Sequence, residues 1–162
     1  MGFAGALAVL DAALRMGADR EVMRKMLRAT RRGVGQARRA LAHADANAES
    51  PGESWCRAQM IEAGLPMPRL QHEFRDRDGF VARSDFDWAG RLVGEFDGKV
   101  KYQKYLREGE DATDAVVREK KREDRLRRLG VMVIRWTWAD LERGTVAATV
   151  RQWLTTLELG AA

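Results

Sequence analysis

The sequence contains only one cysteine and two histidines among its 162 residues. A single cysteine excludes an internal disulfide framework and a zinc site with several thiolate ligands, and it is typical of proteins of the reducing cytoplasm. The two histidines, His43 and His72, leave little room for a histidine-rich metal site. A metal centre in this chain would therefore depend on oxygen ligands.

Long apolar runs and glycine-rich phosphate loops are also missing. No stretch approaches the roughly 18 apolar residues of a membrane-spanning helix, so we expect no membrane partner. The first residues lack the basic start of a signal peptide and Asp11 follows them closely, so we expect a cytoplasmic protein. Without a glycine-rich phosphate loop, an enzyme driven by ATP or GTP is disfavoured.

The composition is that of a folded, mildly basic protein. Hydrophobic residues make up 45% of the chain, charged residues make up 33%, and there are five tryptophans, which excludes a disordered chain. The 29 Lys and Arg exceed the 24 Asp and Glu by five, which allows a polyanionic partner. Many basic proteins bind no nucleic acid, so charge alone leaves both alternatives open.

The first 45 or so residues read as short amphipathic helices. Apolar residues recur there at spacings of three and four, and Asp19 is placed to cap the second helix. Ser50 before Pro51 indicates a new helix N-terminus. We therefore expect a helical extension over residues 1–48, with the main domain at 49–160. Two further expectations are a protein partner bound through the N-terminal helices and a homodimer.

The pattern beyond this boundary alternates between helices and strands. Gly79 after Arg77-Asp78 indicates a hairpin turn, and Gly130 is placed to end a long charged helix. The order is helix, three strands, helix, strand, helix, which predicts an α/β fold with an αβββαβ core and a mixed sheet. The predicted ranges are helices at 53–63, 111–129 and 145–157, and strands at 70–75, 80–88, 92–99 and 131–134.

The most informative feature is a group of acids on the second and third strands. A three-residue link at 89–91 gives the only register that separates aromatic from acidic side chains, and it places Asp85 opposite Glu95. Asp97 lies two residues further along the strand, on the same face as Glu95. Facing carboxylates repel each other unless something compensates them, and Mg²⁺ or Mn²⁺ held by carboxylate oxygens would do so. Lys99 would then help to stabilise charge during phosphodiester hydrolysis.

Simpler interpretations of the charged residues remain open. The acids, including Asp87, can form a solvated strand edge that pairs with Arg83 and Arg91. Acids and bases three and four apart support a solvated helix at 111–129. The alternative is that this helix presents a phosphate-binding face, made by Lys121, Arg125 and Arg128.

Taken together, these motifs resemble the Vsr-like branch of the PD-(D/E)XK nuclease superfamily, as found at the C-terminus of AbiEi-antitoxin-like actinobacterial proteins. The resemblance covers roughly residues 49–143 and implies a restriction-endonuclease-like fold. It implies that Asp85 is the first metal-binding aspartate, that Glu95 is the acid of the third strand, and that Glu53 is the helix glutamate. The chain departs from the family pattern where Asp97 stands in the place of the lysine. The motifs are Asp85-Phe-Asp-Trp88, Glu95-Phe-Asp-Gly98, Glu119 to Arg122, Leu126 to Gly130, and Val133 to Trp138.

The resulting hypothesis is a metal-dependent DNA endonuclease that acts in phage defence, repair or a mobile element. Its metal ligands would be Asp85, Glu95 and Asp97, with Lys99 and Glu53 assisting. Its DNA contacts would come from the basic residues that follow the third strand and line the long helix, namely Lys101, Lys121, Arg122, Arg125 and Arg128. The alternative is a nuclease fold that no longer cuts and acts as a DNA- or protein-binding regulator, such as an antitoxin or a phage effector.

Overall fold

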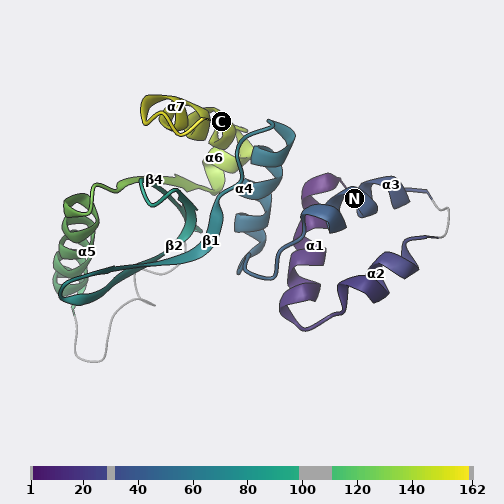
Figure 1. Ribbon diagram of the computed structural model, residues 1–162, viewed down its shortest axis with the longest axis horizontal. Helices are drawn as coiled ribbons and strands as arrows, with labels where there is room; N and C mark the ends of the chain where they lie inside the picture. Colours follow the sequence, from purple (N-terminus) through teal and green to yellow (C-terminus); the bar gives the residue numbers. More distant parts are fainter. Residues whose placement is uncertain (1, 29–31, 99–110, 161–162) are drawn as a thin grey trace.

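A computed structural model describes residues 2–28, 32–98 and 111–160, which form seven helices and four strands (Figure 1). The sheet and the helices that flank it have the order α4, β1, β2, β3, α5, β4, α6, α7. Three helices precede them. The bounds are α1 Phe3–Arg15, α2 Arg20–Met26, α3 Val34–His43, α4 Pro51–Glu62, β1 Arg69–Asp76, β2 Gly79–Trp88, β3 Leu92–Asp97, α5 Ala112–Arg128, β4 Met132–Thr137, α6 Trp138–Glu142 and α7 Val146–Thr156.

The helix ends follow local chemistry in the sequence. The side chain of Asp19 accepts hydrogen bonds from the first backbone N–H groups of α2, as the sequence predicts. Ser50 accepts the backbone N–H of Glu53 at 3.2 Å, and Pro51 is the first residue of α4. Gly130 adopts a positive φ of 77° directly after α5, a conformation that glycine reaches without steric cost. These signals fix where the helices around the sheet begin and end.

The sheet has the order β1-β2-β3-β4. β1, β2 and β3 are antiparallel neighbours, whereas β4 lies parallel to β3 after the crossover through α5. Trp88 pairs with Leu92 and Phe86 with Gly94, which is the register expected for a three-residue link. The expected α/β class, the mixed sheet and the αβββαβ order are thus confirmed.

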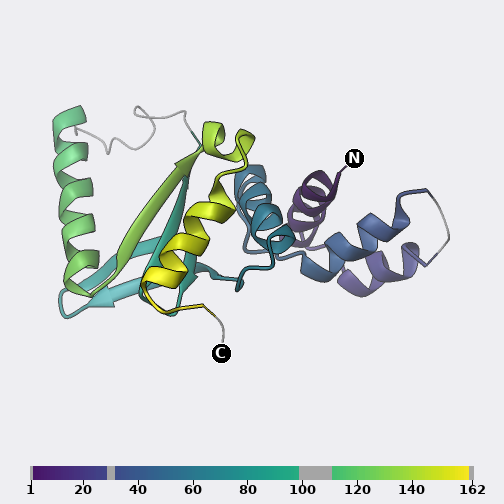
Figure 2. The same cartoon turned by 90° about the horizontal axis from the view of Figure 1, so that it is seen from above.

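Helices cover both faces of the sheet, as Figure 2 shows. α5 packs on one face, where Leu126 is fully buried against Val93 and other small apolar side chains. α4, α6 and α7 cover the other face, where Phe86 and Trp136 form the centre of the larger apolar cluster. Because β2 and β3 lie between these layers, an acid on either strand can point to a different helix.

The N-terminal helices pack against the outer side of α4 through a buried polar group. Asp11 of α1 is fully buried and accepts hydrogen bonds from the Arg57 guanidinium and from the Ser54 hydroxyl, each at 2.7 Å. Its other oxygen accepts the backbone N–H of Asp45 at 2.7 Å. The predicted helical extension at 1–48 therefore shares α4 with the sheet domain. Among the described residues, no helix is long and apolar enough to cross a membrane.

Two sequence predictions about the end of the chain need correction. The apolar run predicted the last strand over residues 131–134, whereas β4 continues to Thr137, within the strand motif of the resemblance, because Trp136 fills the core beside Phe86. The short helix α6 was not predicted at all. It begins where Asp140 accepts both the backbone N–H and the hydroxyl of Thr137, at 2.8 and 2.9 Å.

Candidate functional site

Glu53 is the acid that the resemblance assigns to the helix before the sheet. It stands in the first turn of α4 and is only 7% exposed. Its carboxylate accepts the backbone N–H of Glu49 at 2.9 Å and the Ser50 hydroxyl at 2.7 Å. It also accepts the side-chain amide of Gln71, from β1, at 3.1 Å. Three donors thus hold one carboxylate between α4 and the sheet.

Asp85 lies beside this carboxylate on β2. Its Oδ2 atom accepts the backbone N–H of Phe96 from β3 at 2.8 Å. Gln71 lies across from Asp85 in β1, between the pairs Leu70–Phe86 and His72–Ser84, and has a left-handed φ of 53°. Left-handed backbone at a residue other than glycine costs free energy and often marks a functional site. Here it turns Gln71 toward both acids.

Burial raises the pKa of both acids, and nearby negative charges add to the rise. Burial is the main cause that raises the pKa of Asp85 to about 7, and the charges of Glu53 and Glu95 add to it. The hydrogen bonds from Phe96 and Gln71 oppose this rise. Burial also raises the pKa of Glu53, against the hydrogen bonds from Ser50 and Glu49. Both carboxyls therefore resist ionisation in the folded protein.

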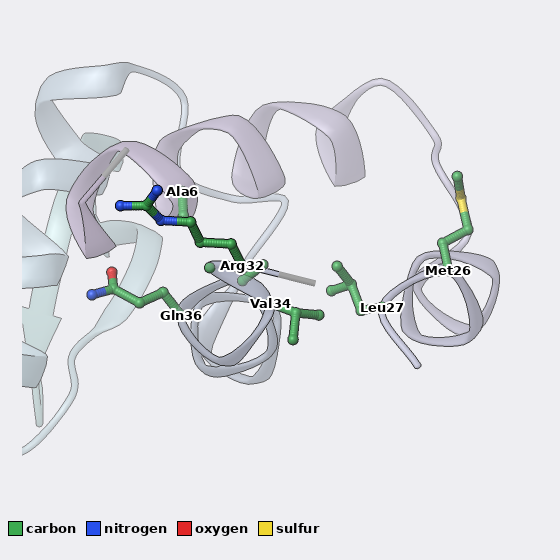
Figure 3. A pocket seen from close by; sticks show the side chains of 8 residues that line it. Ala6, Met26, Leu27, Arg32, Val34 and Gln36 are labelled. Carbon is green, nitrogen blue, oxygen red and sulfur yellow. The ribbon is translucent and has the colours of Figure 1, made fainter. Parts of the chain in front are cut away.

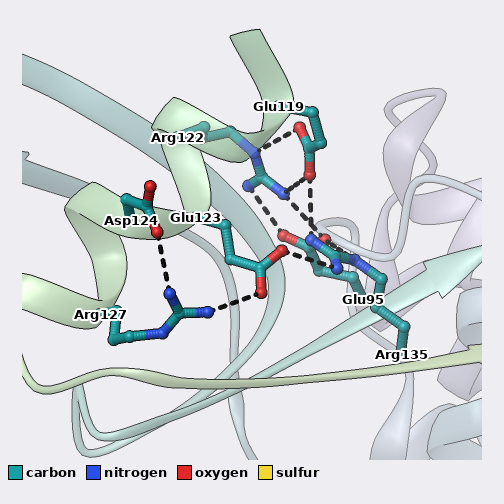
Figure 4. A network of polar contacts seen from close by, with 7 residues as sticks. All are labelled: Glu95, Glu119, Arg122, Glu123, Asp124, Arg127 and Arg135. Atoms are coloured by element: carbon teal, nitrogen blue, oxygen red, sulfur yellow. Dashed lines mark hydrogen bonds and ion pairs between the residues drawn. The ribbon is translucent and has the colours of Figure 1, made fainter. Parts of the chain in front are cut away.

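Glu95 has a different environment, in a network of ions on the α5 side of the sheet (Figure 4). Arg122 of α5 binds both of its carboxylate oxygens, at 2.9 and 3.0 Å. Arg135 of β4, its partner in the parallel register, reaches the same carboxylate at 3.0 Å. Glu119 and Glu123 complete the network by accepting from these arginines. The carboxylate of Glu95 is therefore neutralised by groups of the chain itself.

Asp85, Glu95 and Asp97, the ligands expected from the sequence, have different surroundings in the structure. In the part of the chain that the structure describes, no group of three His, Cys, Asp or Glu side chains is arranged to hold a metal ion. Glu95 is bound by Arg122 and Arg135, whereas Asp85 accepts the backbone N–H of Phe96 and is repelled by the charges of Glu53 and Glu95. Asp97 is exposed at the end of β3, and Lys99 lies outside the described residues.

Asp87, the remaining acid of the pattern, has a structural role. It is 1% exposed and accepts the Arg69 guanidinium at 2.5 and 2.9 Å. Its other oxygen accepts the backbone N–H of Gly90 at 2.9 Å, in the turn between β2 and β3. This acid stabilises the hairpin that carries Asp85.

The basic residues predicted to contact DNA fall into three groups. Arg122 binds Glu95, and Arg125 binds Asp76 at 2.6 and 2.8 Å, which lowers the pKa of Asp76 to about 2. Both guanidinium groups are therefore directed at acids of the chain, because those acids lie under the α5 face that packs on the sheet. Lys121 and Arg128 are exposed on α5. Lys101 lies outside the described residues.

Sequence reasoning missed two residues of these sites. Nothing in the sequence marks Gln71, because its role depends on a left-handed backbone that glutamine rarely adopts. Arg135 was read only as part of a strand motif. Its contact with Glu95 follows from the parallel register of β3 and β4, which strands separated by the whole of α5 do not reveal.

A cavity of about 320 Å³ lies apart from these acids, between α1, α2 and α3 (Figure 3). Its wall is largely apolar, with Met26 and Leu27 at the end of α2 and Val34 at the start of α3. Arg32 and Gln36 supply its polar groups. No acid lines the cavity, so it is not a candidate for the metal site.

Similar proteins are known, but their names state no activity. The chain is similar to the uncharacterized protein Rv2248 of Mycobacterium tuberculosis strain ATCC 25618 / H37Rv and to the uncharacterized protein MT2308 of strain CDC 1551 / Oshkosh. Each is 35% identical over an alignment of 155 residues, and the match covers 92% of this chain and 54% of the relative. The chain therefore spans about half the length of the curated relatives it matches. No family model and no solved structure matches it.

Proposed function

We propose that this chain is a divalent-metal-dependent nuclease whose metal site is built on Glu53 and Asp85. The proposal rests on two largely buried carboxyls that lie beside each other, one from α4 and one from β2. Gln71 donates a hydrogen bond to Glu53, and its hydrogen bond to Asp85 opposes the rise in the pKa of that acid. Such a pair has no stabilising partner of opposite charge among the contacts described for it. A bound cation would supply that partner.

The donor set suits Mg²⁺ or Mn²⁺ in particular. Magnesium is commonly held by one or two carboxylates, several waters and the phosphates of its substrate, so a third protein carboxylate is not needed. When bound, such an ion polarises a phosphoryl oxygen and lowers the pKa of an attacking water. Nucleic acids are polymers joined by phosphodiester bonds, so they are the substrate class that this chemistry suits. The resemblance to Vsr-like nucleases favours DNA among them.

The residues around the two acids have distinct parts in this proposal. Gln71 and Ser50 orient Glu53, which would position a water or a second ion. The Phe96 backbone N–H binds one oxygen of Asp85, and the remaining lone pairs of this carboxylate would serve the metal. Three further roles stay predictions. Asp97, the last residue of β3, would be a metal ligand. Lys99 and Lys101, which follow it in the sequence, would stabilise charge and contact a phosphate, respectively. A cytoplasmic location and a role in phage defence, repair or a mobile element belong to the same proposal.

One observation favours the second candidate, a nuclease-like domain that binds DNA or a protein without cutting. Glu95 stands at the acidic position that the resemblance assigns to the third strand, yet Arg122 and Arg135 neutralise it. A site that needs this acid as a ligand would be silent. An antitoxin-like regulator or a phage effector would then be the function.

Nicking of supercoiled plasmid separates the two candidates. The first predicts that wild-type protein with Mn²⁺ converts plasmid to open circles, that EDTA stops the reaction, and that Asp85→Asn removes it. The matched control is Asp78→Asn, an exposed acid in the turn between β1 and β2, which should cut like wild type. Absence of metal-dependent cleavage of any nucleic acid by the folded wild type would favour the regulator.

A further inference from the structure

The net positive charge of this protein lies in its first 48 residues. Residues 1–48 contain nine lysines and arginines but four aspartates and glutamates, whereas residues 49–162 contain twenty of each. The entire net charge of +5 therefore belongs to α1, α2, α3 and their connections. The sheet domain, which carries the proposed metal site, is neutral. This division concerns a part of the molecule that the proposed catalytic chemistry does not use.

Several of these basic side chains stabilise helix ends. Arg20 donates to the carbonyls of Leu41 and Ala44 at the end of α3, each at 2.5 Å. Arg38 donates to the carbonyls of Leu27 and Arg28 at the end of α2, at 2.8 and 2.9 Å. Such bonds complement the negative end of a helix dipole, which amounts to about half an elementary charge.

More cations gather at the end of α2 than this role requires. Lys25 and Arg28 lie one helical turn apart, since the backbone N–H of Arg28 donates to the carbonyl of Lys25 at 3.1 Å. Arg32 lines the same cavity as the last residues of α2, and its side chain extends toward Ala6 of α1 (Figure 3). All three are exposed, and none has an acidic partner among the described residues. Arg38 already binds carbonyls at the end of α2. The three additional positive charges therefore exceed the partial negative charge at this end of the α2 dipole.

We infer that Lys25, Arg28 and Arg32 form a contact surface for the phosphate backbone of double-stranded nucleic acid. Clustered lysine and arginine side chains bind phosphates by displacing condensed counterions, without reading the base sequence. The choice of nucleic acid over an acidic protein rests on the proposed function, because a phosphodiester substrate is what the metal site would act on. The structure connects the two regions through α4. One end of that helix holds Glu53, and its next turn is bonded to Asp11 of α1.

This surface lies far from the proposed metal site. α2 and α3 lie at the end of the molecule opposite α5, with α1 and α4 between them and the sheet (Figure 2). A duplex bound at α2 would therefore be held at a distance from Glu53 and Asp85, the acids that would cleave it. Affinity would depend on the N-terminal helices, whereas cleavage would depend on Glu53 and Asp85.

The test is fluorescence anisotropy with a labelled duplex DNA of about 30 base pairs, with the whole chain and in EDTA. The wild type should bind with an affinity that falls steeply with salt. A variant with Lys25→Glu, Arg28→Glu and Arg32→Glu should bind about 100-fold more weakly at ~0.1 M salt, with a salt slope shallower by about three. Arg38 is left intact because it stabilises the helix end, and circular dichroism checks that each variant is folded.

A charge-matched control lies on the sheet domain. Arg77→Glu, Lys120→Glu and Arg143→Glu make the same change in net charge at exposed positions, and this variant should bind within about threefold of wild type. Equal losses in both variants, a normal affinity of the first variant, or no DNA binding by wild type would overturn the inference. Equally tight binding of poly-glutamate through the same three residues would identify an acidic protein as the partner instead. Because EDTA removes metal, failure of cleavage leaves this result unaffected.

Discussion

Arg122 binds both carboxylate oxygens of Glu95, at 2.9 and 3.0 Å, and so neutralises the charge of this acid. Arg135 binds the same carboxylate from the next strand. The two acids of the hairpin therefore have different partners. Glu95 belongs to an ion network with α5 and β4, while Asp85 lies beside Glu53 of α4 and is also repelled by the charge of Glu95. The proposed metal site rests on this difference in partners.

The bidentate contact between Arg122 and Glu95 should contribute to stability. Their side chains are 22% and 17% exposed, so Arg122→Met leaves a largely buried carboxylate with only Arg135. We expect the free energy of unfolding to fall by about 1.5–3 kcal/mol in chemical denaturation. Arg127→Met is the control, because its side chain is 68% exposed and should cost at most ~0.5 kcal/mol. Equal effects of the two substitutions would contradict the network's role.

The raised pKa of Asp85 predicts a pH-dependent stability. Its pKa is near 4 in the unfolded chain and about 7 in the folded one, so the folded state holds the proton more tightly. The stability from this group is complete below about pH 4 and is lost as the pH rises through 7. Asp85→Asn mimics the neutral form. In EDTA its Tm should match wild type below about pH 4 and exceed it by a few degrees at pH 8. A lower Tm than wild type at pH 8 would refute the shift.

Gly94 is required where β3 passes the core. A Cβ atom at this position would lie 2.3 Å from the ring of Trp136, which is 2% exposed and packed against Phe86. Gly94→Ala should therefore destabilise the fold by about 1–3 kcal/mol. Gly35→Ala provides the contrast, because Gly35 is exposed on α3 with open space around it, and alanine should stabilise that helix by roughly 0.5–1 kcal/mol. Thermal denaturation of the two variants should shift in opposite directions, and a neutral Gly94→Ala would disprove the packing argument.

The attachment of the N-terminal helices depends on Asp11. Asp11→Ala leaves Arg57 buried without its counter-charge, so we expect a loss of about 3–5 kcal/mol in the free energy of unfolding. Arg57→Met combined with Asp11→Ala should cost clearly less than the two single changes added together. Additive losses in this double-mutant cycle would show that the pair does not connect α1 with α4.

Much of the fold could be predicted because its signals are local. The capping residues Asp19 and Ser50, the turn before Gly79 and the glycine after α5 each act within a few positions. The pairing of Trp88 with Leu92 could also be derived, because only one register separates aromatic from charged side chains. The hairpin that carries Asp85 was therefore predicted with the correct partners.

The site itself depends on contacts that are distant in the sequence. Glu53 and Gln71 are 18 positions apart, and Glu95 and Arg135 are 40 positions apart. The alternation of a strand shows which side chains share its face, but it does not show which charges cover that face. For this reason the sequence predicted that Glu95 is a metal ligand beside Asp85, but it did not predict the arginines of α5 and β4 that bind Glu95.

Calorimetric titration of Mn²⁺ at pH 8 tests the proposed site most directly, since Asp85 is then mostly ionised. Our account predicts that the wild type binds the ion, that Glu53→Gln and Asp85→Asn each abolish binding, and that Glu95→Gln leaves it unchanged. Loss of binding in Glu95→Gln with binding preserved in Asp85→Asn, or no binding by the folded wild type, would contradict it.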